Sequence, residues 1–321
     1  MKVPLAGIDF MCINTAYKQE GTYDLVIVDE AHRALSPKYR RVFSSIKSDN
    51  WLCLTATLPH LLEYEILLAK YAPVVYQKTV LEGIESKALS QYRLVNVACG
   101  WDADSKRKYG VFDRLFNEAA IQLTSINRYL PNPYASAFDM AKYCRSSADP
   151  VIAKYAKQFW MAMQNRKSAV YSNKEKTKVA AEIVSKYPDK KWILFYKTIS
   201  EAEYAASLLG GRVYHSKLKK AEREAILAEF KSGAFKTLVA VDALNEGFNV
   251  PDVDAAICVS GVSVELVAIQ QLGRVIRFKE GKEALFINLY TKDSVEHRWT
   301  EAKSRSLNPV WVEHSKEIQW C

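Results

Sequence analysis

The sequence predicts an α/β protein with two lobes, each built on a parallel sheet, the first lobe incomplete and a helical insertion between them. Short apolar runs alternate with helical stretches over residues 1–98 and again, more regularly, over 191–298. This alternation is typical of parallel sheets covered by helices. Residues 99–190 are polar, rich in Lys, Tyr and Ala, and show no strand pattern before Trp192. They are therefore expected to form the helical insertion.

The N-terminal region, 1–98, is expected to hold the elements of a partial lobe. Apolar runs and helical periodicity predict strands at Phe10–Thr15, Leu25–Val28 and Trp51–Thr55, a helix at Pro59–Tyr71, and extended segments at Val74–Tyr76 and Tyr92–Val97. A complete three-layer domain of this kind needs about 150–200 residues. The opening strand and helix of this lobe are therefore expected to be missing.

The C-terminal region, 191–298, is expected to form a complete lobe, followed by a tail over 299–321. The predicted strands are Trp192–Tyr196, Arg212–Tyr214, Thr237–Val241, Ala255–Val259 and Ala284–Leu289. Helices are expected from a capping box at Ser200 and Glu203 to Gly210-Gly211, from about Lys217 to Gly233, and over Ser263–Leu272. Parallel strands joined by helices account for this order.

The positive charge is concentrated in the middle of the chain. The net charge is +9, and residues 96–190 contribute +7 of it, while 1–95 and 191–321 contribute +1 each. Clustered Lys and Arg favour contact with a phosphate backbone. A solvated helical surface is the alternative interpretation, and composition alone does not separate the two.

Cysteine usage and hydropathy exclude several classes of protein. The six cysteines are scattered and form no C-x-x-C pair, which argues against a disulfide framework or a zinc site and favours a reducing compartment. No apolar run approaches the roughly 18–20 residues that span a bilayer. We expect a cytoplasmic protein that does not contact membranes.

Asp29 and Glu30 directly follow the apolar run Leu25–Val28. A parallel strand that ends in two carboxylates delivers them to one edge of its sheet, where one can hold Mg²⁺ and the other can orient an attacking water. A phosphate-binding loop, G-x-x-x-x-G-K-[ST], usually accompanies such a strand. The 321 residues contain no such sequence, since the only Gly-Lys pair, Gly281-Lys282, lacks the upstream glycine.

Four segments, in order, resemble the motifs of superfamily 2 helicases of the DEAD/DEAH type. They are Leu25–His32 for motif II, Leu54–Thr57 for motif III, Val239–Pro251 for motif V and Gln270–Arg277 for motif VI. The stretches around Tyr39–Arg41 and Leu81–Ile84 are more similar to phage-type and restriction-enzyme-like members. The resemblance implies two RecA-like lobes that hydrolyse ATP with Mg²⁺.

The resemblance also implies roles for individual residues. In the catalytic set, Asp29 holds Mg²⁺ and Glu30 orients the water. His32 relays between the nucleotide and motif VI through Gln270, and Arg274 and Arg277 are the arginine fingers. The remaining cleft residues are Asp242, Gly247 and Asn249, which contact the nucleotide, and Thr55 and Thr57, which couple the lobes. Arg274 and Arg277 are three residues apart, so a helix would present both on one face.

Nucleic-acid contacts are expected on both lobes and on the insertion. The resemblance to motifs Ib, IV and IVa nominates Thr15, Thr198 and His215. In the basic segment, Lys174, Lys176 and Lys178 would lie on one side of an extended chain, whereas a helix would spread them around its axis.

Together these observations predict an ATP-dependent helicase or translocase that acts on nucleic acid, DNA rather than RNA. It is expected to be the C-terminal part of a split or truncated enzyme, in a bacterial or phage-infected cell, with a partner chain that carries the phosphate-binding loop. The alternative is a nucleic-acid-binding remnant without ATP turnover.

Overall fold

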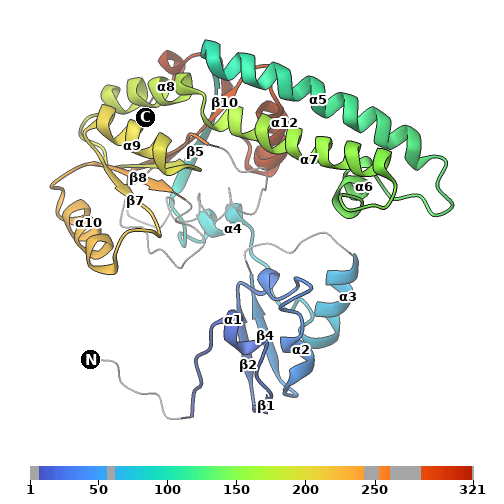
Figure 1. Ribbon diagram of the computed structural model, residues 1–321. Helices are drawn as coiled ribbons and strands as arrows, with labels where there is room; N and C mark the ends of the chain where they lie inside the picture. Colours follow the sequence, from blue (N-terminus) through green and yellow to red (C-terminus); the bar gives the residue numbers. More distant parts are fainter. Residues whose placement is uncertain (1–6, 56–61, 242–252, 261–282, 320–321) are drawn as a thin grey trace. The chain divides into compact units, whose positions relative to one another are not determined.

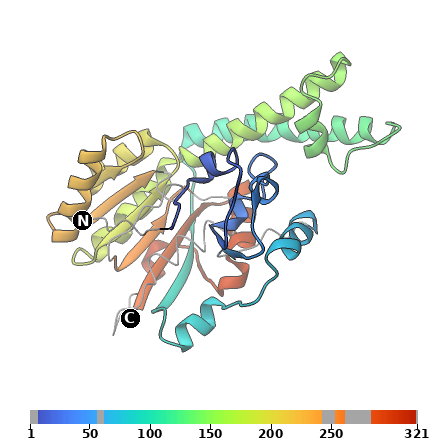
Figure 2. The same ribbon diagram turned by 90° about the horizontal axis from the view of Figure 1, so that it is seen from below.

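The computed structural model describes residues 7–55, 62–241, 253–260 and 283–319. The chain forms two compact units, residues 1–83 and 84–321, and the boundary falls within helix α4, Val80–Glu85 (Figure 1). Figure 2 gives a second view of the same ribbon. Among the described residues, no helix is both long enough and apolar enough to cross a membrane.

The N-terminal unit contains short elements. They are α1 Ile13–Ala16, β1 Gly21–Thr22, β2 Val26–Asp29, the 3-10 turn η1 Ala31–Arg33, α2 Val42–Ser45, β3 Ile46–Lys47, β4 Trp51–Leu54 and α3 Leu62–Tyr71. The strands form two separate parallel pairs, β1 with β3 and β2 with β4. The expected strand at Phe10–Thr15 is wrong, because its second half forms α1, and Val74–Tyr76 forms no strand.

The β2–β4 pair of the N-terminal unit has one covered and one open face. Val28 of β2 is buried with Phe43 and other apolar side chains in a small core. The alternate positions point the other way, and Ile27, Leu52 and Leu54 are 57%, 38% and 47% exposed. Since side chains of a strand alternate between faces, one apolar face of this sheet lacks a covering layer among the described residues.

The C-terminal unit is built on a seven-stranded sheet in which every printed pairing is parallel. The strand order is β11-β5-β10-β9-β6-β8-β7. Their bounds are β5 Gln91–Cys99, β6 Trp192–Tyr196, β7 Arg212–Tyr214, β8 Thr237–Val241, β9 Ala255–Cys258, β10 Glu283–Thr291 and β11 Val310–Val312. The predicted α/β class with parallel strands and helices is confirmed.

The helices of this unit cover the sheet or extend from it. They are α5 Ala103–Asn127, α6 Ala137–Tyr143, α7 Pro150–Tyr171, α8 Lys174–Lys186, α9 Ile199–Leu209, α10 Lys220–Ser232 and α12 Val295–Ser304, with 3-10 turns η3 Arg305–Leu307 and η4 Ser315–Glu317. Thr198, not Ser200, is the N-cap of α9, and its hydroxyl accepts from the Glu201 amide. The helix ends at Gly210, whose φ of +63° favours glycine.

Strand β5 belongs to the C-terminal unit, although the sequence analysis placed it in the N-terminal region. It pairs with β10 along its whole length and with β11 on its other side. In this ladder Asn96 is the cross-strand partner of Asn288, and the Asn288 side-chain amide donates to Asn96 Oδ1 at 2.8 Å. Both residues are buried. The expected boundary between the first lobe and the insertion, at residue 98, therefore lies after the boundary between the two units, which falls at residues 83 and 84.

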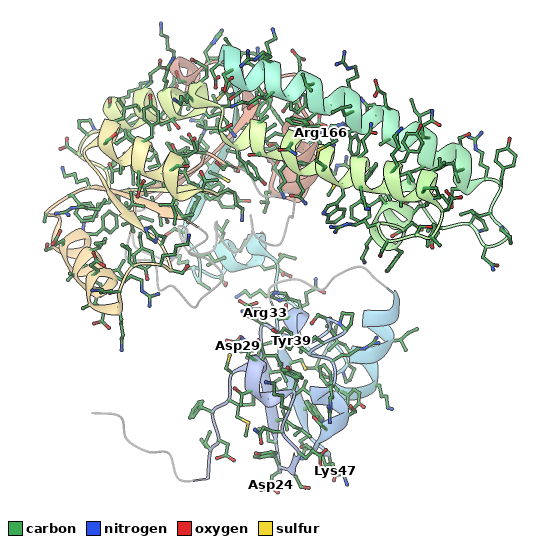
Figure 3. The ribbon with its side chains drawn as sticks, viewed as in Figure 1. Asp24, Asp29, Arg33, Tyr39, Lys47 and Arg166 are labelled. Atoms are coloured by element: carbon green, nitrogen blue, oxygen red, sulfur yellow. The ribbon has the colours of Figure 1, made fainter. Side chains whose placement is uncertain are left out.

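Helices α5 and α7 form a long hairpin with α6 at its distal end (Figure 1). Arg166, labelled in Figure 3, donates to Asp113 Oδ1 at 2.8 Å and lies 3.8 Å from the centre of the Phe116 ring. Helix α8 follows the hairpin but packs differently, because its Ala180, Ile183 and Val184 belong to the core of the sheet. Only the first three helices of the segment 99–190 therefore form the hairpin.

Candidate nucleotide and nucleic-acid site

Asp29 and Glu30 lie at the carboxyl end of β2, as the sequence predicts. Asp29 is exposed, and its Oδ1 accepts from the Glu30 amide at 2.9 Å. Glu30 has a left-handed backbone, with φ of 51° and ψ of 48°, before the 3-10 turn η1 begins. Such a conformation is uncommon for a residue with a side chain and costs on the order of 1–3 kcal/mol. The strand ends at Asp29, which is labelled in Figure 3, and the chain then changes direction at Glu30.

His32 connects these carboxylates to the end of the neighbouring strand β4. Its Nδ1 lies 3.0 Å from Thr55 Oγ1 and 3.3 Å from Glu30 Oε2. Strands β2 and β4 are parallel neighbours with Asp29 opposite Leu54, so residues after both strands meet at one edge. The structure thus brings together four candidate residues of motifs II and III, Asp29, Glu30, His32 and Thr55.

Burial lowers the pKa of His32 below its ordinary value, and the nearby Glu30 carboxylate opposes that effect only in part. Geometry alone would suggest an ion pair with Glu30, which would raise the pKa. The desolvation of the ring is the larger effect, since the side chain is only 14% exposed. His32 is therefore a neutral hydrogen-bonding group at pH 7.

The carboxylates fit a magnesium ion that is bound together with a nucleotide. Magnesium takes oxygen ligands and is commonly held by one or two carboxylates, with water and substrate phosphates as the other ligands. In the described part of the chain, no cluster of three or more His, Cys, Asp or Glu forms a complete metal cage. Asp29 can supply such a single carboxylate.

Several candidate residues fall outside the described residues. These are Thr57 of motif III, Asp242, Gly247 and Asn249 of motif V, and Gln270, Arg274 and Arg277 of motif VI. Their roles stay predictions from the sequence.

Thr15 lies on α1 beside a group of tyrosines and lysines that the sequence analysis did not single out. Thr15 is exposed, and the Tyr39 hydroxyl donates to the side chain of Asn14 next to it. The Lys38 ammonium lies 5.3 Å from the ring centre of Tyr17 and 5.0 Å from that of Tyr39. The neighbouring pairs Tyr17-Lys18 and Lys38-Tyr39 are the signal in the sequence. A cation held between two rings beside Thr15 suits a phosphate backbone.

Thr198 and His215 follow β6 and β7, which both pair with β8, so they lie at the carboxyl edge of the large sheet. Thr198 is exposed and caps α9. His215 is partly buried, and its Nδ1 has no hydrogen-bond partner among the described residues. Both positions are compatible with the expected contacts, and neither contact is tested by the geometry.

The interpretation of Lys174, Lys176 and Lys178 as one binding surface is wrong, because these residues lie on helix α8 and face different surroundings. Lys176 is fully buried, and its ammonium contacts the two Glu296 carboxylate oxygens at 2.9 and 3.1 Å. Lys178 pairs with Glu175 at 2.6 Å, and only Lys174 is exposed without an ion pair in the described chain. Lys176 therefore cannot contact nucleic acid. Glu296 is 120 residues away, and no local pattern points to it.

Two family models match the chain. "Type III restriction enzyme, res subunit" matches residues 6–60, which include motif II, and "Helicase conserved C-terminal domain" matches residues 175–279, which include motifs V and VI.

Two relatives are DNA motor proteins by name. The DNA 3'-5' translocase XPB2 of Sulfurisphaera tokodaii is 28% identical over 300 residues, which cover 92% of this chain and 65% of that protein. The DNA 3'-5' helicase XPB of Mycobacterium tuberculosis is 28% identical over 134 residues, which cover 41% of this chain and 24% of that protein. The chain thus spans less than two thirds of the length of either relative.

The fold is similar to those of solved helicase structures. The Pyrococcus furiosus Hef helicase domain aligns with a TM-score of 0.54 at 16% identity, covering 91% of this chain and 77% of that one. The S. cerevisiae protein Dbp5 bound to RNA and ADP BeF3 aligns with a TM-score of 0.54 at 13% identity, covering 94% and 63%. At this identity the likeness shows a RecA-like fold. With motif II at the end of β2 and both family models in place, the chain is similar to helicase-type proteins of superfamily 2.

Proposed function

We propose that this chain carries the water-orienting and magnesium-holding carboxylates of an ATP-driven DNA translocase or helicase, with the phosphate-binding loop supplied from outside these 321 residues. The observation that carries the proposal is the connected group at the carboxyl edge of the β2–β4 pair. There His32 lies within hydrogen-bond range of Thr55 and 3.3 Å from Glu30. The names of the two relatives support DNA as the substrate and a 3'-5' direction of movement.

Each residue of this group has a distinct task. Asp29 would hold Mg²⁺, which when bound neutralises charge on the phosphates of ATP. Glu30 accepts a proton from the attacking water through a hydrogen bond and so orients that water for in-line attack. His32, neutral at pH 7, bonds to Thr55 and restrains the position of the Glu30 carboxylate. A shift at the end of β4 would therefore change the position of the base.

The C-terminal unit would complete the machinery. Motif VI would provide Arg274 and Arg277, whose guanidinium groups neutralise charge that develops on the transferred phosphate. Thr198 and His215, at the carboxyl edge of the large sheet, would contact the backbone of the DNA, as would Thr15 in the N-terminal unit. These assignments rest on the family resemblance.

The test is ATP hydrolysis by the purified 321-residue chain, with and without DNA. We expect no turnover above background, because positioning of the triphosphate dominates phosphoryl transfer and the chain holds no loop to provide it. Adding a polypeptide that carries such a loop, or extending the chain by one, should give DNA-stimulated turnover. Glu30→Gln should then lower turnover by about 10²–10⁴-fold, the usual contribution of a general base.

Glu85→Gln is the matched control, since Glu85 is an exposed glutamate on α4 that is not part of the group. Its turnover should equal that of the unchanged chain. DNA-stimulated hydrolysis by the 321 residues alone would contradict the need for an external loop. If DNA binds but no loop-bearing polypeptide restores turnover, the chain is a DNA-binding protein without ATPase activity, and the proposed function fails.

A further inference from the structure

The distal end of the α5–α7 hairpin holds cations against aromatic rings. We name it the tip surface and define it by Tyr134, Phe138, Lys142, Tyr143, Arg145 and Trp160. We propose that the tip surface binds single-stranded DNA by stacking bases on its rings and by contacting phosphates with its cations. This inference extends the proposed function by giving its DNA a contact on the hairpin.

The rings of the tip surface form two contacts. Tyr134 and Tyr143 are nearly parallel, with centres 6.2 Å apart and planes 15° apart. Phe138 and Trp160 have centres 6.0 Å apart. The outer rings are open to solvent, with Tyr143 62% and Phe138 44% exposed. Exposed rings that lie close together offer a flat apolar face on which an unpaired base, a partner of similar size, can stack.

The cations at the tip surface lie over rings and not beside carboxylates. The Lys142 ammonium is 4.9 Å from the ring centre of Tyr143, and the Arg145 guanidinium is 5.4 Å from that of Trp160. Neither makes an ion pair with any described residue. The nearby Asp139 carboxylate accepts from the Ser136 hydroxyl at 2.6 Å at the start of α6. The positive charge of Lys142 and Arg145 is therefore available to phosphates.

Two cations nearer the base of the same hairpin are paired with carboxylates instead. There Lys108 pairs with Asp104 at 2.6 Å, and the buried Arg166 pairs with Asp113 at 2.8 Å. Cations that are already neutralised in this way contribute little to phosphate binding. Lys108 and Arg166 at the base are thus neutralised by carboxylates, whereas Lys142 and Arg145 at the tip are not.

The tip surface is held in place before any ligand binds. Asn127 donates from Nδ2 to the Tyr134 carbonyl and accepts from the Tyr134 amide, each at 2.8 Å. Met140 and Ala141 of α6 are fully buried against α5 and α7. A surface that is already ordered loses little conformational entropy when a strand binds.

A single strand fits these features better than a duplex or a protein partner does. The bases of a duplex are already stacked and cannot cover the ring of Tyr143 without being turned out. An apolar protein surface would bury Lys142 and Arg145 without a counterion, which is costly. A strand supplies both a flat apolar face and a phosphate for each nucleotide.

The test is fluorescence anisotropy of a labelled dT₂₀ oligonucleotide with the full chain, without nucleotide, over a salt series. Tyr143→Ala should weaken binding about tenfold, within the range for loss of one base–aromatic stack. Tyr143→Phe should keep the affinity, since it keeps the ring. Lys142→Ala should reduce the salt slope by about 0.7, the value for one phosphate contact on a single strand. The control Lys106→Ala removes an exposed charge at the base of the hairpin and should leave the slope unchanged.

Ultraviolet cross-linking of dT₂₀ followed by peptide mapping gives a second measurement. The cross-link should fall within residues 134–145 and disappear in Tyr143→Ala. The proposal is overturned if Tyr143→Ala binds dT₂₀ as tightly as the unchanged chain, or if Lys106→Ala and Lys142→Ala lower the slope equally. It is also overturned if the tip variants abolish self-association in sedimentation without changing dT₂₀ affinity, because the tip would then be a protein contact. The assay needs no ATP, so failure of the hydrolysis test leaves its outcome unchanged.

Discussion

The two units of this protein bury their parallel strands to different extents. In the C-terminal unit all five residues of β6 are buried, and helices α8 and α9 contribute with the strands to one continuous core. In the N-terminal unit β2 and β4 form an isolated pair, and Leu54 of β4 is 47% exposed. The carboxylates proposed for catalysis therefore lie on the less covered of the two sheets.

The unit with the larger buried core is therefore not the unit that carries the proposed catalytic carboxylates. The C-terminal unit has the larger buried apolar area, which stabilises its fold, and it encloses an ion pair that needs both partners. In the N-terminal unit, the proposed catalytic carboxylates lie at the carboxyl end of β2. One face of the β2–β4 pair lacks a covering layer among the described residues. We expect the two units to unfold separately, and the following predictions test this comparison.

The largest effect is expected from the buried ion pair of the C-terminal unit. Lys176→Met leaves the fully buried Glu296 carboxylate without its counterion. The free energy of unfolding of this unit should fall by about 3–5 kcal/mol, the usual cost of an uncompensated buried charge. Urea denaturation combined with hydrogen exchange of the β10 and α12 peptides measures this loss, and β2 and β4 should keep their protection.

Lys178→Ala on the same helix is the matched control. Its partner Glu175 is partly exposed and Lys178 itself is exposed, so the free energy of unfolding should stay close to that of the unchanged chain. Equal losses in the two variants would show that burial of Lys176 does not decide its contribution. Lost protection in β2 and β4 would show that the units are not independent.

A matched pair of leucines compares the two sheets directly. Leu194 of β6 is fully buried, and Leu194→Ala should cost about 2–5 kcal/mol. Leu54→Ala should cost less than about 1 kcal/mol, because much of that side chain is already in water. Chemical denaturation of the two variants measures both values. A Leu54→Ala variant as unstable as Leu194→Ala would mean that the face of β2 and β4 is covered in solution.

The smallest effect is a pH dependence in the N-terminal unit. Because burial lowers the pKa of His32, the folded unit binds a proton less readily than the unfolded chain. The free energy of unfolding should therefore fall as the pH drops below the ordinary histidine pKa, and His32→Gln should remove that part of the dependence. NMR titration of the His32 ring should give a pKa below its ordinary value. A higher pKa would mean that the ion pair with Glu30 outweighs burial.

Most strands of the C-terminal unit could be predicted from the sequence, because their apolar runs are short, continuous and bounded by helix caps. Trp192–Tyr196 and Thr237–Val241 form strands with the predicted bounds. That β5 belongs to the sheet of the C-terminal unit could not be predicted. Its partner β10 follows almost 200 residues later, and a local pattern carries no information on pairing. The segment Ile13–Ala16 was misassigned because a short apolar run does not distinguish a strand from one turn of helix.

The site was predictable where neighbouring residues act together. Asp29, Glu30 and His32 are adjacent in sequence, and the strand before them determines where they lie. The surroundings of Lys176 were not predictable, because a buried lysine looks like any other lysine until Glu296 is placed against it. The tip surface was missed for a similar reason, since Arg145 and Trp160 come together only when α6 folds back on α7.

The buried pair of Asn96 and Asn288 has a further consequence for the hairpin. Moving β5 by one residue against β10 would turn both amides away from each other and leave polar groups unpaired in an apolar interior. Only one alignment of the two strands therefore keeps the hydrogen bond between the two amides. Because α5 starts a few residues after β5 ends, that alignment also sets the point on the sheet edge from which the hairpin departs. The pairing of two asparagines thus determines where α5, a helix of more than twenty residues, begins.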